Sequence, residues 1–236
     1  YFAFEHGTLR QIPFVPDRQG RLTALAYALS QHAFVTNFDC WENAGILCGE
    51  RRTALNHPYD EDHGLKVSGA DTKREKLLSS LGADFLFFFP TRHDWVEGTG
   101  YADKDNDVFL NAFVKFRNNG YRVGLICCEW GVNVENSKTL LEDQGVTRHV
   151  KWIQPTGIIE FSRICRSVDV VIDQFRLGAF GGILFKAMSN GTPVCTYLDG
   201  DKILEQYPEC PPVINCQTTA DLLRNLSTYL EKIKSA

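Results

Sequence analysis

A glycine-rich turn between a predicted strand and a predicted helix is the stretch with the most evident binding chemistry. It covers residues 178–194, with the sequence GAFGGILFKAMSNGTPV. Glycines let a ligand approach the backbone closely, and the free N–H groups and partial positive charge at a helix start suit a diphosphate. The alternative is a strand–helix turn that needs glycine only for its bend, and the residues alone leave both interpretations open.

Two acidic stretches resemble metal-binding segments in part. Residues 103–107 alternate acids as a calcium loop does, but Val108 stands where that loop needs glycine and Val114 where it needs glutamate. The same stretch contains Asp-x-Asp, a metal-binding pair that is common by chance. Residues 57–63, HPYDEDH, hold two histidines and three acids, yet a solvated linker is the more ordinary interpretation. We therefore predict no metal site.

The chain around the glycine-rich turn alternates strand and helix patterns. Apolar runs bounded by glycine, proline or acids predict buried strands at 85–89, 121–127, 150–153, 169–173, 193–198 and 213–215. Apolar residues at helical spacing predict helices at 105–118, 134–144, 157–167 and 182–190, and after Thr218, which forms a capping box with Asp221. This alternation predicts an α/β fold: a Rossmann-like parallel sheet with helices on both faces and ligands at the carboxyl ends of its strands.

Residues 1–58 form a separate block with the same alternation. Strands are predicted up to residues 5–7 and at 33–36, and helices near 21–31 and 41–48. Residues 59–74 are polar and charged and predict a linker, which leaves 75–236 as the main domain. Because a compact protein rarely begins inside an apolar strand, the opening residues YFAF suggest a piece of a longer protein.

Composition is that of an ordinary soluble globular protein. Apolar residues make up 44% and charged residues 23%, and a net charge of −4 offers no basic face for nucleic acid. No apolar run reaches the roughly 18 residues of a membrane span. The eight cysteines contain no Cys-x-x-Cys pair and lie mostly in apolar runs, which predicts buried, reduced thiols and a cytoplasmic protein.

The glycine-rich stretch resembles the signature of the retaining GT-B glycosyltransferases of the family 4 or group 1 type. The matching residues are Phe180, Gly181, Ala187, Met188, Gly191, Pro193 and Val194. Further stretches resemble family landmarks in family order: residues 90–95 (PTRHDW), 104–107 (KDND, against Lys-Gly-x-Asp), 150–153 (VKWI) and 173–175 (DQF). The resemblance implies a GT-B fold, with the C-terminal nucleotide-sugar-binding domain in residues 75–236 and part of a second Rossmann-like domain in residues 1–58.

The resemblance also implies roles for single residues. Arg92 and Lys104 match the two cations that clamp the donor diphosphate, helped by backbone N–H groups of Gly181 and Gly182. Fixed cations stabilise the negative charge that the leaving nucleoside diphosphate gains as the glycosidic bond breaks. Taken singly, either residue fits a solvated surface charge better, and the ordered motifs reverse that preference. The residues implied to lie near the nucleotide or sugar are Ile153, Asp173, Phe180 and Lys186.

Two positions depart from the family pattern. The family glutamate that contacts the donor sugar falls on Gly178, and the glutamate that usually holds the ribose hydroxyls falls on Lys186. A lysine ammonium has no acceptor for hydroxyl protons, although it can reach a phosphate. The second departure puts nucleotide affinity in question.

In the N-terminal block, residues 5–10 (EHGTLR) resemble the loop where the family keeps a histidine that faces the donor sugar. His6 is therefore the candidate catalytic residue, and a purely structural histidine is the alternative. Residues 36–39 match the next strand end. Residues 1–58 are then expected to be the later half of an acceptor-side domain.

The resemblance implies a retaining, metal-independent glycosyltransferase of polysaccharide biosynthesis. It would move a sugar from a UDP-, GDP- or similar donor to a glycan, lipid or small-molecule acceptor, with no cofactor. The partners expected are the nucleotide-sugar and a glycan or lipid-linked acceptor, without nucleic acid. The location expected is the cytoplasm, with peripheral association at the inner membrane face as a variant of it. The alternatives are a non-catalytic nucleotide-binding or degenerate glycosyltransferase-like module and, third, a sugar-nucleotide 2-epimerase of the same fold.

Overall fold

In the computed structural model the chain forms two compact units. The small unit contains Tyr1–Pro58 and Asp199–Cys210, and the large unit contains Tyr59–Leu198 and Pro211–Ala236. The structure describes residues 1–56, 67–96, 103–205 and 207–235. The stretch 57–63, considered above as a metal site, lies outside the described residues.

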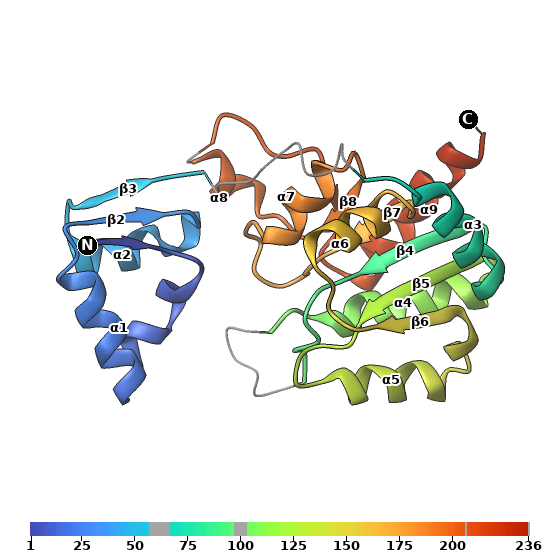
Figure 1. The fold of residues 1–236 in the computed structure, drawn as a ribbon, viewed down its shortest axis with the longest axis horizontal. Coiled ribbons are helices and arrows are strands. Elements are labelled where there is room, and N and C mark those ends of the chain that lie inside the picture. The colour runs from blue at the N-terminus through green and yellow to red at the C-terminus, as the bar shows by residue number, and fades with distance from the viewer. Residues whose placement is uncertain (57–66, 97–102, 206, 236) are drawn as a thin grey trace. The chain divides into compact units, whose positions relative to one another are not determined.

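The large unit is built on a parallel sheet with β4 and β7 side by side near its centre (Figure 1). Its strands are β4 (Phe85–Phe89), β5 (Val123–Cys128), β6 (Val150–Ile153), β7 (Val170–Ile172), β8 (Val194–Thr196) and β9 (Ile214–Asn215). Their order is β6-β5-β4-β7-β8-β9, with every neighbouring pair parallel. The chain first forms β4, β5 and β6 in order toward one edge of the sheet. It then continues with β7, β8 and β9 from the other side of β4 toward the opposite edge. The carboxyl ends of β4 and β7 therefore form the switch point at which such sheets bind ligands.

Helices cover both faces of this sheet, as predicted. One face packs against α4 (Asn106–Asn118), α5 (Val134–Asp143) and α9 (Thr219–Ser235), and the other against α3 (Ala70–Leu81), α6 (Ile158–Cys165) and α7 (Gly182–Met188). Side chains alternate between the two cores, so that Phe87 and Phe89 enter the first and Leu86 and Phe88 the second. A strand buried on both faces is apolar throughout, which explains the continuous run at 85–89.

Three elements were not predicted. Helix α3 begins at Ala70, so residues 70–74 of the expected linker are helical. Only Leu77 and Leu81 of this helix are buried, and so sparse an apolar face gives little periodic signal. Strand β3 (Arg52–Ala54) and helix α8 (Gly200–Leu204) are too short to show a pattern.

The small unit contains a three-stranded parallel sheet in the order β1-β2-β3, with β1 at Phe2–Phe4 and β2 at His32–Val35. Its helices α1 (Arg18–Ala28) and α2 (Trp41–Cys48) share one core cluster with Ala33 and Val35 of β2 (Figure 1). Phe2 and Phe34 pack together on the opposite face, and Phe2 is 65% exposed. Among the described residues, the short 3-10 helices are Thr8–Arg10, Ile12–Phe14, Phe38–Cys40 and Thr147–His149.

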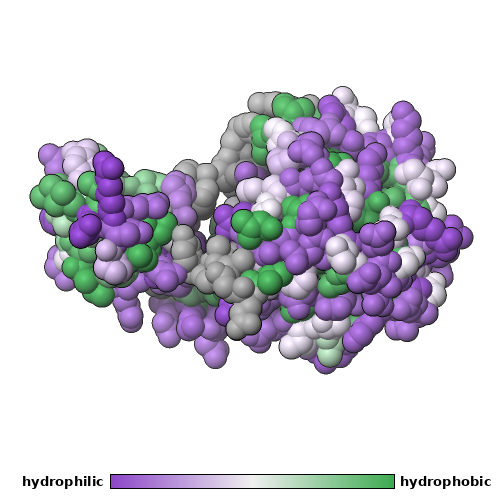
Figure 2. Space-filling model, turned by 90° about the horizontal axis from the view of Figure 1, so that it is seen from below, coloured by the Kyte–Doolittle hydropathy of each residue, from purple (hydrophilic) through white to green (hydrophobic). Residues whose placement is uncertain are grey.

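Exposed apolar side chains are frequent in the small unit. Figure 2 shows several apolar patches on the visible face of that unit, while the visible face of the large unit is mostly polar. Parallel sheets usually bury both faces. Helices α1 and α2 pack on one face of this sheet and leave Phe2 and Phe34 on the other. The assignment of residues 1–58 to the later half of an acceptor-side domain stays a prediction.

Several predicted properties can be read directly from the described residues. Seven of the eight cysteines are buried and Cys210 is exposed, and all eight thiols are free. No described helix has both the length and the apolar character needed to cross a membrane. Thr218 and Asp221 exchange hydrogen bonds at the start of α9, as the capping box predicts.

Candidate functional site

Buried polar residues gather at the carboxyl ends of β4 and β7. They are Thr91, Asp94, Asn106, Asp173 and Gln174, and none is more than 5% exposed. Burying polar groups costs free energy unless hydrogen bonds compensate. This edge of the sheet is therefore organised by specific contacts rather than by apolar packing alone.

Asp94, in the loop after β4, contacts both of the predicted cationic residues. Its carboxylate forms an ion pair with the Arg92 guanidinium and accepts the Val132 N–H at 2.9 Å. Its carbonyl accepts the Lys104 N–H at 2.7 Å, and its own N–H donates to Asn106 Oδ1 at 3.1 Å. Asp94 therefore restrains the side chain of Arg92 and the backbone of Lys104.

The loop after β7 reaches the same cluster. Asp173 Oδ1 accepts the Thr91 hydroxyl at 3.1 Å, and the Phe175 N–H donates to the Lys104 carbonyl at 3.1 Å. A Cβ on Gly181 would stand only 2.5 Å from Asp173 Oδ2. The structure therefore brings Arg92, the backbone of Lys104, Asp173 and Gly181 together at the switch point.

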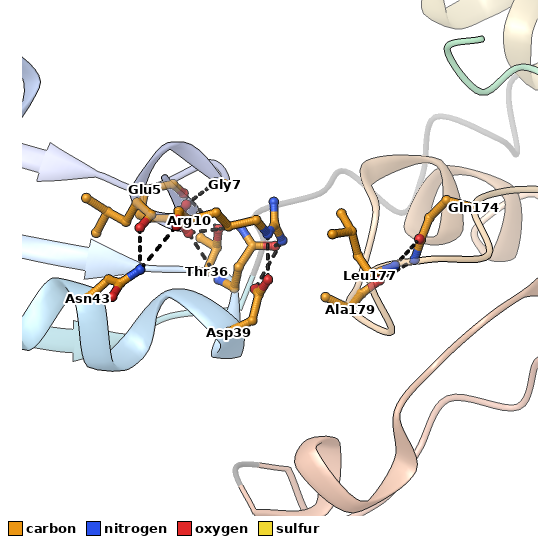
Figure 3. A network of polar contacts seen from close by, with 11 residues as sticks. Glu5, Gly7, Arg10, Thr36, Asp39, Asn43, Gln174, Leu177 and Ala179 are labelled. Atoms are coloured by element: carbon orange, nitrogen blue, oxygen red, sulfur yellow. Dashed lines mark hydrogen bonds and ion pairs between the residues drawn. The ribbon is translucent and has the colours of Figure 1, made fainter. Parts of the chain in front are cut away.

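Gln174 shapes the glycine-rich turn through hydrogen bonds to its backbone (Figure 3). Its Oε1 accepts the N–H groups of Arg176 at 3.0 Å and Leu177 at 2.7 Å, and its Nε2 donates to the Ala179 carbonyl at 3.2 Å. Gly178 is buried in this turn with a left-handed φ of +65°. A glutamate would be strained in that conformation, which gives a physical reason for the first departure from the family pattern.

Helix α7 follows the turn and is shorter than predicted, with seven residues, Gly182–Met188. Its partial positive charge is correspondingly small. The backbone N–H groups of Gly181 and Gly182 remain candidate donors to a diphosphate.

Three other predicted residues lie around this cluster. Ile153 ends the edge strand β6, and its carbonyl accepts the Glu129 N–H at 2.7 Å. The Phe180 ring lies 5.6 Å from the Phe185 ring. The Lys186 ammonium lies over the Phe161 ring, 6.0 Å from its centroid, in the geometry of a cation–π contact.

His6 belongs to the small unit, where it follows β1. Its ring is exposed and lies 4.7 Å from the Phe4 ring. The adjacent Glu5 is fully buried and accepts the Gly7 N–H and, at 2.8 Å, the Asn37 Nδ2–H. Arg10 donates to both carboxylate oxygens of Asp39, at 2.5 and 3.1 Å; Figure 3 shows these polar contacts. This network fixes the loop that carries His6, and the catalytic role of His6 stays a prediction.

The sequence reasoning missed the residues that hold the site together, namely Thr91, Asp94, Asn106 and Gln174. Each follows a predicted apolar strand or begins a predicted helix, so a polar residue at a strand's carboxyl end was the available signal. The Thr91–Asp173 and Asp94–Asn106 contacts join residues 82 and 12 positions apart in sequence, which no local pattern reveals, whereas the Gln174 contacts with Arg176, Leu177 and Ala179 are local.

Asp105 is the only non-glycine residue with a positive φ, +49°, among the described residues. It occupies the position where the family motif has glycine, and its carboxylate accepts Arg176 Nη1 at 3.2 Å. We expect Asp105→Gly to be more stable than Asp105→Ala by about 1 kcal/mol, because only alanine pays the left-handed strain. Both variants lose the Arg176 contact, so the difference between their free energies of unfolding in urea reports the backbone strain alone. Equal stabilities would contradict the assigned conformation.

His93 is fully buried next to Arg92. Its Nδ1 is 2.9 Å from Ser137 Oγ, and its ring packs against Phe89 and Trp152. Burial lowers the pKa of His93 to about 4, against the opposing charge of Asp94. The imidazole is therefore neutral in the folded protein near neutral pH.

This depressed pKa predicts a loss of stability in mild acid. Between about pH 6.5 and pH 4 the unfolded chain binds a proton that folded His93 does not, so the free energy of unfolding falls as the pH falls. The total loss from this group is about 3 kcal/mol. Urea unfolding at pH 7 and pH 4.5 should show a smaller pH dependence in His93→Gln than in the wild type. The same pH dependence in both would refute the prediction.

Comparisons with known proteins identify the fold. Neither the family-model scan nor the search of curated proteins finds a match. HepE from Anabaena, solved with UDP and glucose, superimposes with a TM-score of 0.75 at 14% identity, over 99% of this chain and 62% of HepE. Sucrose-phosphate synthase from Thermosynechococcus elongatus gives 0.62 at 14% identity, over 98% of this chain and 58% of the synthase.

The C-terminal domain of LpcC, a group 1 glycosyltransferase from Francisella tularensis, gives a TM-score of 0.55 at 12% identity, over 75% of this chain and 90% of that domain. The fold is therefore that of the GT-B glycosyltransferases, as the resemblance of the glycine-rich stretch implied. The chain spans about three-fifths of the length of HepE and of the synthase.

Proposed function

We propose that the large unit binds the diphosphate of a nucleotide-sugar and that the protein is a retaining, metal-independent glycosyltransferase. The observation that supports this best is the contact set of Asp94, which holds Arg92 and Lys104 at the switch point of the sheet. The glycine-rich turn begins at the same place, with Gly181 directly over Asp173. Two cations beside an accessible backbone are what a diphosphate requires.

The chemistry follows from the charge that develops in the reaction. As the bond between the anomeric carbon and the β-phosphate oxygen breaks, its electron pair moves to that oxygen. The Arg92 guanidinium and the Lys104 ammonium stabilise this growing negative charge, and so lower the barrier to transfer. His6 is proposed to face the donor sugar.

UDP-sugars are the first donors to test, because HepE has been solved with UDP and with UDP-glucose. A glycan or lipid-linked acceptor, a role in polysaccharide biosynthesis and a cytoplasmic place at the inner membrane face rest on the sequence resemblance, and stay predictions.

A non-catalytic nucleotide-binding module is the second candidate, and Lys186 is the observation that favours it. A cation in place of the ribose-binding glutamate removes an acceptor, and the ammonium is engaged over the Phe161 ring. In this case the diphosphate would still bind, without sugar transfer.

Calorimetric titration with UDP, GDP and their sugars separates the candidates. Binding of a nucleotide together with slow hydrolysis of its sugar donor supports the transferase. Binding without hydrolysis supports the module. No binding of any of these nucleotides would refute both and leave a scaffold that has the fold alone.

A further inference from the structure

Asp173 ends the central strand β7 and is the most unusual charged residue of the candidate site. It is 4% exposed, and Oδ1 accepts the Thr91 hydroxyl from the loop after β4 at 3.1 Å. Oδ2 has no hydrogen-bond partner within the described part of the chain. The Gly181 backbone covers this oxygen so closely that no side chain fits there.

A buried carboxylate with one unpaired oxygen is costly to the fold. Burial raises the pKa of Asp173, and the positive charge of Lys104 and the Thr91 hydrogen bond act against this rise. Charge interactions are strong where water is excluded. Asp173 and Lys104 are therefore coupled electrostatically, although they lie on the loops of two different strands.

The backbone of Lys104 is fixed at both of its polar atoms. Its N–H donates to the Asp94 carbonyl, and its carbonyl accepts the Phe175 N–H, two residues beyond Asp173. The lysine side chain therefore starts from a fixed point beside the loop of β7.

We propose that Asp173 is a positioning residue that sets the direction of the Lys104 ammonium and so prepares it to receive a diphosphate. The inference rests on the proposed function and adds a residue that acts through Lys104 rather than on the ligand. Removing the charge of Asp173 should weaken diphosphate binding only as long as Lys104 is present.

A double-mutant cycle with UDP as the probe tests this proposal. Asp173→Asn keeps the side-chain size and an acceptor for Thr91 but removes the charge. We expect Asp173→Asn and Lys104→Ala each to weaken UDP binding by about tenfold or more, as loss of a residue that orients a ligand-binding group typically does. Because both act through one ammonium, the double variant should bind UDP no more weakly than Lys104→Ala.

The outcomes distinguish the positioning role of Asp173 from the diphosphate-binding role of Lys104. Losses that multiply in the double variant, or unchanged UDP affinity in Asp173→Asn, would overturn the positioning role and leave the diphosphate role of Lys104 intact. Unchanged affinity in Lys104→Ala would overturn that diphosphate role and the positioning role with it.

Asp169→Asn is the matched control, since Asp169 precedes the same strand and pairs with Arg74 at 2.9 Å. It should lower stability without changing UDP affinity. If Asp173→Asn does not fold, Thr91→Val replaces it in the cycle, because it removes the hydrogen bond that the Thr91 hydroxyl donates to the carboxylate. Thr91→Val should then weaken UDP binding in the wild type and have no further effect in Lys104→Ala. Additive losses would again overturn the proposal.

Discussion

Replacing Arg92 with alanine is expected to lower the rate of sugar transfer by at least about 100-fold, the usual effect of removing one group that stabilises transition-state charge. The Arg92 side chain is 40% exposed and forms its ion pair with Asp94 through Nε, the nitrogen nearest the chain. This arrangement orients the side chain while leaving much of it accessible to a ligand. Turnover of the donor that binds in calorimetry, with and without the mutation, is the measurement.

Stability should change little in this variant. A partly exposed ion pair contributes about 1 kcal/mol or less. Arg224→Ala is the matched control, because Arg224 forms an exposed ion pair with Asp221 on α9, away from the predicted site residues. Wild-type turnover in Arg92→Ala, with Arg224→Ala also normal, would contradict the assignment of Arg92.

Gly181→Ala is expected to be the most damaging single-methyl change in the glycine-rich turn. The backbone of Gly181 has an ordinary φ of −106°, so alanine is not strained there by its own conformation. The new Cβ would stand 2.5 Å from Asp173 Oδ2, and the buried carboxylate would have to move. We expect a loss of about 1–3 kcal/mol in the free energy of unfolding, the typical cost of overpacking, together with weaker UDP binding.

Gly182→Ala provides the comparison one residue further on. A Cβ on Gly182 meets no atom within 4 Å, and alanine favours the helix that begins there. Urea unfolding should therefore rank the proteins with Gly181→Ala clearly less stable than Gly182→Ala. The reverse order, or equal stabilities, would show that Gly181 is not packed against Asp173 as described.

Much of the large unit was predictable because its strands are buried on both faces. The run at 85–89 and the helical spacing in 105–118 each carry a strong local signal, and β4 and α4 match both. Helix α3 escaped prediction because most of its surface is polar. Alternation of strands and helices then restricts the topology to a parallel sheet, which explains why the α/β assignment was correct.

The candidate site was predictable only in part. The resemblance named Arg92, Lys104 and Asp173, and the structure places them at one edge of the sheet. The resemblance did not indicate that Asp94 contacts both Arg92 and Lys104. Asp94 pairs with Arg92 through its carboxylate and accepts the Lys104 N–H through its backbone carbonyl, and no sequence pattern marks this combination. The left-handed conformation of Gly178 was likewise hidden, since glycine adopts either sign of φ.

A crystal structure of the protein soaked with UDP-glucose tests the central claim most directly. We predict diphosphate density at the carboxyl ends of β4 and β7, within hydrogen-bonding distance of the Arg92 guanidinium, the Lys104 ammonium and the backbone of Gly181 or Gly182. Density for the nucleotide elsewhere, with these two cations directed into separate regions of solvent, would contradict the account.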